Sequence, residues 1–151
     1  MADAEASQFI GGPQARSVAW RGLLQVAGAW AIQGFSMFSV IEAATGRWIG
    51  RLGPWFPEGW PGREVGWGII PQAQGKGYAL EGSTAAMDWA FDHLGWTDVV
   101  HTIDPDNVAS QHLAERLGSR NLGPGRLPAP YDANPVDVWG QTRDAWRARR
   151  R

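Results

Sequence analysis

The sequence predicts one α+β domain, in which a helix is followed by three antiparallel strands and then by alternating helices and strands. Three observations predict this fold class. Apolar residues near the N-terminus have helical spacing, two aromatic and β-branched segments flank a turn, and a further strand leads through glycines into a second helix. The 151 residues, 44% of them apolar, suffice to build a sizeable core.

The first half of the chain is expected to hold one helix and three strands. The helix is predicted over residues 14–32, with Gly34 ending it. Its helical spacing comes from Ala19, Leu23, Val26, Ala27 and Trp30. Residues 35–43 and 48–55 flank a short glycine-containing turn and predict a hairpin. A loop rich in proline and glycine then leads to a strand over residues 64–70.

The second half alternates helices and strands. The elements expected there are a helix over 78–94, a strand over 97–103, a helix over 108–117 and a strand over 136–142. Asn107 can cap the shorter helix, and Gly118 ends it. Residues 119–135 contain four prolines and are predicted to form a loop, and the basic residues 143–151 to form a solvated, frayed tail.

Composition excludes several functional classes. A net charge of -1 argues against a nucleic-acid partner, which usually requires a broad basic face. The absence of cysteine excludes disulfides and thiolate catalysis, and three scattered histidines make a poor metal site, so we expect no metal. No apolar run approaches the roughly 20 residues that cross a bilayer. We therefore expect a cytoplasmic protein with no membrane partner.

Tryptophan is abundant, with ten residues, and histidine is sparse. An aromatic surface for sugars or bases would be the functional interpretation of the tryptophans, but aromatic residues mostly serve burial, so we favour packing. The histidines His93, His101 and His112 lie on or beside elements expected to be half-buried. We expect them to pack rather than to catalyse.

The segment from Val65 to Ala79 carries the strongest functional signal. A strand runs into a loop containing Gly75, Lys76 and Gly77, and the loop opens a helix. The first turn of a helix has unpaired N–H groups and a positive dipole end, so a pyrophosphate can bind to the main chain there. Glycine lets the backbone approach a phosphate closely, and Lys76 is the one lysine in the chain.

These motifs resemble the GCN5-related N-acetyltransferase (GNAT) superfamily, and within it the branch that acetylates ribosomal-protein N-termini. The superfamily pattern Gln/Arg-x-x-Gly-x-Gly/Ala is met by residues 72–77, and its asparagine-led short helix closing in Leu-Gly by residues 107–118. The match covers roughly residues 9 to 147. It implies a mixed, mostly antiparallel central sheet flanked by helices, here without the usual first strand.

Two departures from the family accompany the resemblance. Family members begin with a further strand and helix, so we expect Met1 to start inside the fold, and the chain could be a truncated form of a longer enzyme. The strand over residues 35–43 would then be an unprotected edge, open to pairing with another chain. Many members also place a tyrosine, which protonates the leaving thiolate, at the position of Ala114.

The resemblance implies direct acetyl transfer from acetyl-CoA to a primary amine, a protein N-terminus or a small amine, in a ternary complex. The cofactor-binding residues that it implies are Ile69, Ile70, Gln74, Gly75, Lys76, Gly77, Tyr78, Ala79 and Asn107. Amides from Gln74 to Ala79 would hold the pyrophosphate, and the strand at Ile69 and Ile70 would pair with the pantetheine amides. An N–H of Ile69 or Ile70 could stabilise the oxyanion.

Two side chains are candidate catalytic residues. Ser110, one turn after Asn107, could donate a hydrogen bond to the departing thiolate, although plain capping chemistry is an equal alternative. Glu64, at the start of the central strand, could act as base or orient the amine, directly or through water. A surface glutamate without a catalytic role is the alternative for Glu64.

Two other functions compete with acetyl transfer. A dinucleotide-binding fold would need a third glycine where Leu80 stands, so we reject it. A non-catalytic acyl-CoA-binding module is the stronger rival, because the proton-donating tyrosine is missing. The acceptor amine is unspecified, with residues 55–62 and 124–135 as the segments expected to contact it, and the protein is expected to be a monomer or a homodimer.

Overall fold

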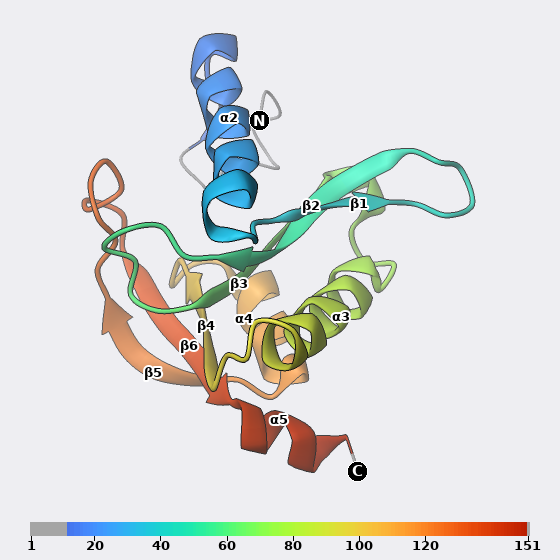
Figure 1. The fold of residues 1–151 in the computed structure, drawn as a ribbon, viewed down its shortest axis with the longest axis vertical. Coiled ribbons are helices and arrows are strands. Elements are labelled where there is room, and N and C mark those ends of the chain that lie inside the picture. Colours follow the sequence, from blue (N-terminus) through green and yellow to red (C-terminus); the bar gives the residue numbers. More distant parts are fainter. Residues whose placement is uncertain (1–11, 151) are drawn as a thin grey trace.

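The computed structural model describes residues 12–150, which form one mixed sheet with helices packed around it (Figure 1). The helices are α2 (Arg16–Gln33), the 3₁₀ turn η1 (Pro71–Ala73), α3 (Tyr78–Asp92), α4 (Val108–Leu117) and α5 (Arg143–Arg149). The strands are β1 (Phe38–Ile41), β2 (Trp48–Trp55), β3 (Glu64–Ile69), β4 (Asp98–Ile103), β5 (Arg120–Gly125) and β6 (Val136–Thr142). The predicted α+β class and the mostly antiparallel sheet are confirmed.

The six strands lie in the order β1-β2-β3-β4-β6-β5, and all neighbours are antiparallel except β3 and β4. The parallel pair has a single register partner, Glu64 opposite Val100. Beyond this point the two strands separate, as the course of β3 and β4 in Figure 1 shows. The separation leaves the backbone of β3 without a strand partner on one side.

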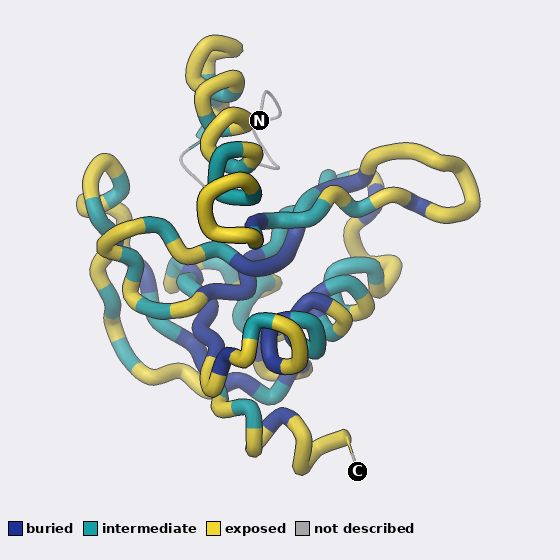
Figure 2. Tube along the Cα trace, viewed as in Figure 1, coloured by how far each residue is buried: buried dark blue, intermediate teal, exposed yellow. Residues whose placement is uncertain are grey.

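The main core lies between the central strands and the helices α3 and α4. Its buried residues include Val65 of β3, Met87 and Phe91 of α3, Val99 of β4 and Leu117 of α4. In Figure 2 the buried colour follows the central strands and the inner side of α3. Apolar burial at the centre of the sheet therefore fixes the first turn of α3 next to the end of β3.

Helix α2 forms where the apolar spacing predicts it, but none of its residues is buried among the described ones. Leu23 is 57% exposed and Ile32 is 86% exposed. Its last turns contact the body of the domain through Trp30, whose ring lies 5.3 Å from that of Phe38, and through Gln33, whose Nε2 donates to Phe56 O at 3.3 Å. The spacing thus located the helix and its end at Gly34, although most of its apolar side chains lie off the core.

Strand β1 is the edge of the sheet among the described residues, because it pairs only with β2. It is shorter than the predicted strand over residues 35–43, with a register shift between Val40 and Ile41 that ends regular pairing. Short length and irregularity are common features of edge strands, which limit further pairing.

Strand β5 lies within residues 119–135, which were predicted to be loop. Its sequence lacks the alternation of a half-buried strand, because the segment contains Pro124 and two glycines and its Leu122 is exposed. Proline is tolerated here since β5 is the opposite edge of the sheet. The strand forms through pairing with β6, a tertiary contact that local sequence does not encode.

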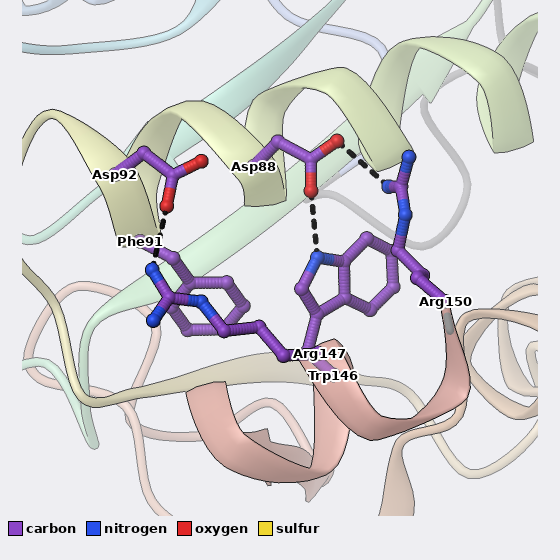
Figure 3. Close-up of a pocket in the computed structure, with 6 residues that line it drawn as sticks. All are labelled: Asp88, Phe91, Asp92, Trp146, Arg147 and Arg150. Atoms are coloured by element: carbon purple, nitrogen blue, oxygen red, sulfur yellow. Dashed lines mark hydrogen bonds and ion pairs between the residues drawn. The ribbon is translucent and has the colours of Figure 1, made fainter.

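The expected frayed tail is also corrected, because residues 143–149 form the helix α5. Thr142 caps it, and Trp146 is buried beside Phe91 of α3. In Figure 3 three side chains of α5 face two carboxylates of α3. A surface hollow of about 420 Å³ lies there, lined by Asp88, Phe91, Asp92, Trp146, Arg147 and Arg150. The basic residues are thus partly fixed by ion pairs.

Three contacts join α5 to α3. The indole Nε1 of Trp146 donates to Asp88 at 2.7 Å, Arg150 contacts the other oxygen of Asp88 at 2.7 Å, and Arg147 contacts Asp92 at 2.9 Å. The two ion pairs are largely solvated and contribute little. Burial of the indole and its bond to a carboxylate account for most of the stabilisation.

The variant Trp146→Phe is expected to lose about 1–2 kcal/mol of unfolding free energy, because it removes the donor to Asp88 while keeping an aromatic ring. For a chain of this length that corresponds to a fall of roughly 2–8 °C in Tm. The matched control is Trp20→Phe on the exposed helix α2, which should change Tm little. Equal effects of the two substitutions would contradict this account of α5.

Candidate active site

The loop between β3 and α3 exposes an uncapped helix N-terminus. Gly75 and Gly77 have positive φ angles of 72° and 89°, and Gly77 is the N-cap of α3. A Cβ added to either glycine would meet nothing within 4 Å. No side chain caps the helix, and its first backbone hydrogen bond runs from Glu81 N to Gly77 O at 3.0 Å. The first-turn amides therefore face open space, as a phosphate site requires.

The structure refines the predicted set of phosphate-binding amides. Gln74 is already engaged, because its N–H donates to Pro71 O at 3.1 Å and its side-chain amide donates to Ile69 O at 2.9 Å. The N–H groups from Gly75 to Ala79 form no hydrogen bond with a described residue, so of the predicted set only Gln74 is removed. Lys76 is exposed beside them. Tyr78 donates to Glu42 at 2.8 Å, which ties the β1–β2 hairpin to the start of α3.

The backbone of β3 alternates between its two neighbours. Ile70 N–H donates to Ile49 O of the β2 side at 2.9 Å, so it is not free to act as the oxyanion donor proposed from the sequence. By the same alternation the backbone groups of Ile69 and Trp67 point to the side where β4 has separated. These two residues therefore present unpaired amides, and Trp67 is a site residue that sequence reasoning missed.

Helix α4 places Asn107 and Ser110 on the other side of this separation. Asn107 Oδ1 accepts from Ser110 N at 3.1 Å, which confirms the capping role and leaves the amide nitrogen of Asn107 without a partner among residues 12–150. The indole Nε1 of Trp67 donates to Ser110 Oγ at 3.1 Å. Because the Ser110 oxygen accepts this bond, its own O–H can be directed to another acceptor.

Ala114, where many family members have tyrosine, is fully buried in a cluster with Ile103 and Trp139. Trp67 packs against this cluster from β3. A hydroxyl from α4 that reaches the β3 side thus comes from Ser110 rather than from position 114.

Glu64 is buried at the point where β3 and β4 meet, so the expectation of a surface glutamate is wrong. Its Oε2 accepts from Trp60 Nε1 and from Thr102 Oγ1 at 2.9 Å, while its Oε1 has only a long bond of 3.4 Å from Thr102 N. Burial raises the pKa of Glu64 to about 6, although these hydrogen bonds and the charge of Arg51 oppose the rise. The carboxylate is therefore a weak base with one oxygen largely unoccupied.

The two segments expected to contact the acceptor lie together beside Glu64. The ring of Trp60 lies 6.4 Å from that of Trp55 and 6.5 Å from that of Tyr131, with near-perpendicular planes. A Cβ on Gly59 would come within 3.2 Å of Pro128, so the two loops are in contact. Trp60 thus donates its indole N–H to the carboxylate, and Trp55 and Tyr131 pack around the Trp60 ring.

Among the three histidines only His101 packs in the core as predicted. Its Nδ1 bonds Val65 O at 2.7 Å and its Nε2 bonds Ser119 Oγ at 2.9 Å. Burial lowers the pKa of His101 to about 4, so the imidazole is neutral at physiological pH. His93 is exposed but its ring stacks on that of Trp89, with centroids 5.9 Å apart, so it packs on the surface rather than in the core. His112 is exposed, which corrects the expectation that it packs.

Comparison with known proteins agrees with this geometry. Residues 1–120 match the model of the acetyltransferase (GNAT) domain family. The uncharacterized N-acetyltransferase YnaD of Bacillus subtilis is 32% identical over 60 residues, which span 40% of this chain and 35% of that protein. An acetyltransferase structure from Agrobacterium tumefaciens has 28% identity and a TM-score of 0.77, covering 91% of this chain and 78% of that one.

A similar fold occurs in the ribosomal-protein-S5-alanine acetyltransferase of Vibrio fischeri, with 17% identity, a TM-score of 0.70, and coverage of 96% and 88% of the two chains. The chain belongs to the GNAT acetyltransferase family. No helix among residues 12–150 is long and apolar enough to span a membrane.

Proposed function

We propose that this protein transfers an acetyl group from acetyl-CoA to a primary amine in a ternary complex. One observation carries the proposal. The open, uncapped first turn of α3 follows directly on the strand whose Trp67 and Ile69 amides lack a strand partner. The first feature suits a pyrophosphate, and the second suits the amides of a pantetheine chain laid along β3.

The side chains at this separation have the properties that the reaction requires. The amine nitrogen attacks the thioester carbonyl carbon, the C–S bond breaks, and the amine proton passes to Glu64 directly or through water. The largely unoccupied Oε1 of Glu64 is the receiving atom. The amide N–H of Ile69 or Trp67 would donate to the oxyanion, and the Ser110 O–H, whose oxygen accepts from Trp67 Nε1, would donate to the departing sulfur.

Protein N-termini are the acceptor class that the family resemblance favours, with small amines as the other class. The test is consumption of the acetyl-CoA thioester in the presence of peptide N-termini and of small amines, with product mass confirming N-acetylation. Transfer to at least one acceptor supports the proposal.

A non-catalytic acyl-CoA-binding module is the second candidate, and the buried Ala114 in place of the family's tyrosine favours it. It predicts that acetyl-CoA binds and that no acceptor in the panel is acetylated. That result would overturn the transferase proposal and leave the cofactor site standing.

The variant Ser110→Ala is expected to lower kcat for acetyl transfer roughly ten-fold, because one hydrogen bond that strengthens with thiolate formation is worth about 1.4 kcal/mol. The capping bond uses the Ser110 backbone N–H and survives the substitution. The control is Ser39→Ala on the exposed side of β1, which should leave kcat unchanged. A normal kcat in Ser110→Ala would assign Ser110 to structure alone.

A further inference from the structure

A second charged side chain, Arg51 of β2, shares the face of the sheet on which Glu64 lies. In the β2–β3 pairing Arg51 stands opposite Gly68, and Trp55 stands opposite Glu64. Directly opposed residues share a face, as do residues two apart, so these four lie on one side. Leu52, with the opposite parity, belongs to the core beneath α3. Arg51 and Glu64 therefore both face away from α3.

Glycines separate the two charged residues on this face. Gly53 pairs with Gly66 between them, and Gly68 lies opposite Arg51. A Cβ on Gly66 would lie 3.0 Å from Cε of Met37 and 3.1 Å from Oε1 of Glu64, so both side chains lie over Gly66, the carboxylate oxygen in the direction of Arg51. The Cα atoms of Glu64 and Gly68 are four residues apart, about 13 Å in a strand. This face of the sheet, called here the track, thus has the Glu64 carboxylate at one end and the Arg51 guanidinium at the other.

Arg51 has no anionic partner among residues 12–150. Its side chain forms no ion pair within 4.0 Å and no hydrogen bond with any described residue, although it is only partly exposed. Burial lowers the pKa of Arg51, and the charge of Glu64 offsets this only in part. A desolvated guanidinium without a hydrogen-bond acceptor is unfavourable, and a planar carboxylate is the ligand that satisfies it bidentately.

We propose that Arg51 binds a carboxylate of the acceptor, so that the preferred acceptors are amines that also carry a carboxylate close to the reacting nitrogen. This inference rests on the proposed acetyl transfer and names its substrate class. In this proposal the amine of the acceptor lies at Glu64 and its carboxylate lies at Arg51. Each group of the acceptor therefore meets a side chain of complementary charge. A free amino acid and a peptide with an acidic residue near its N-terminus both have this chemistry.

The test compares acceptors that differ only in the carboxylate. One arm uses an amino acid and its amide, and the other uses two peptides that differ by Glu or Gln at the second residue. The wild-type protein is expected to favour the carboxylate member of at least one pair by ten-fold or more in kcat/KM. The pair that shows the preference identifies the source.

Substitution of Arg51 then tests its role. Arg51→Met is expected to bring the carboxylate-to-amide ratio of kcat/KM close to 1, and Arg51→Lys, which keeps the charge but not the bidentate fork, to give an intermediate ratio. The control Arg120→Met removes an exposed arginine from the far edge strand and should keep the wild-type ratio. A wild-type ratio of 1 or less, or an unchanged ratio in Arg51→Met, would overturn the proposal.

Calorimetric binding separates this proposal from the proposed function. Tighter binding of the carboxylate acceptor than of its amide, lost in Arg51→Met and accompanied by no acetyl transfer, would overturn the transferase proposal and keep the carboxylate site. Acetyl transfer with equal affinity for the two acceptors would overturn the carboxylate site alone. If Arg51→Met fails to fold, Arg51→Lys supplies the same comparison.

Discussion

Glu64→Gln is expected to lower kcat/KM for acetyl transfer by about 10²–10⁴, the usual contribution of a general base. The substitution keeps the shape of the side chain and the acceptor oxygen for Trp60 or Thr102, but removes the proton-accepting carboxylate. In the wild-type protein kcat/KM should fall as the pH drops below about 6, because the pKa of Glu64 is raised to about 6 and the protonated form cannot act as base. The acid limb should be absent from the variant.

The matched control for this prediction is Glu115→Gln, which replaces an exposed glutamate of α4 outside the loops expected to contact the acceptor and should keep both the rate and the acid limb. The measurement is a pH profile of kcat/KM from pH 5 to 8 for the three proteins. A glutamine variant with wild-type activity at pH 7.5 would remove Glu64 from the reaction.

The same substitution has a predictable effect on stability. The pKa of Glu64 rises from 4.5 in the unfolded chain to about 6 in the fold, so its protonated form stabilises the fold. This contribution is complete below pH 4.5 and is lost as the pH rises through 6. Above pH 7 the loss of this contribution lowers the free energy of unfolding by about 2 kcal/mol relative to pH 4.5. Urea unfolding should show Glu64→Gln gaining on the wild type by up to this amount between pH 4.5 and 7, whereas Glu115→Gln should not gain.

Gly77→Val is expected to abolish the stabilisation of the protein by acetyl-CoA. At about 100 times its Kd the ligand should add roughly 2.7 kcal/mol to the unfolding free energy of the wild-type protein. Valine at position 77 would place a branched side chain in the open space before the first turn of α3, where a diphosphate would lie. It would also have to adopt a φ of 89°, which costs a non-glycine residue about 1–2 kcal/mol.

Gly95→Val separates the two effects of that substitution. Gly95 follows the other end of α3, has a φ of 67°, and likewise has nothing within 4 Å of an added Cβ. It should therefore carry a similar backbone cost and keep the full response to acetyl-CoA. Thermal or urea unfolding with and without the ligand measures both quantities. A full response in Gly77→Val would place the diphosphate elsewhere.

The sequence predicted those parts of the fold that local patterns encode. Apolar spacing, caps and glycines located the helices α3 and α4. They also located the strands β2, β3, β4 and β6. Strand β5 and helix α5 were missed because each depends on a partner distant in the chain, β6 for the one and Asp88 of α3 for the other. Helix α2 was placed correctly, but its apolar spacing did not reveal that it lies off the core.

The candidate site was predictable to a similar extent. Glycine spacing located the open N-terminus of α3, because the requirement for a left-handed backbone leaves a trace in the sequence. The bond of Trp67 to Ser110 spans 43 residues, and the face shared by Arg51 and Glu64 depends on strand register. No local pattern carries such information, so these residues emerged only from the three-dimensional arrangement.

The contact of His101 with Val65 has a consequence for how a cofactor enters. The carbonyl of Val65 is bonded by an imidazole of β4 instead of a backbone amide, so the ladder between the two parallel strands stops there and a side chain sets their spacing. The imidazole of His101 is neutral and fully buried, and its other nitrogen, Nε2, is hydrogen-bonded to Ser119 Oγ. The entry between β3 and β4 is therefore preformed, and no main-chain hydrogen bond between these strands has to break for an extended ligand to lie along β3.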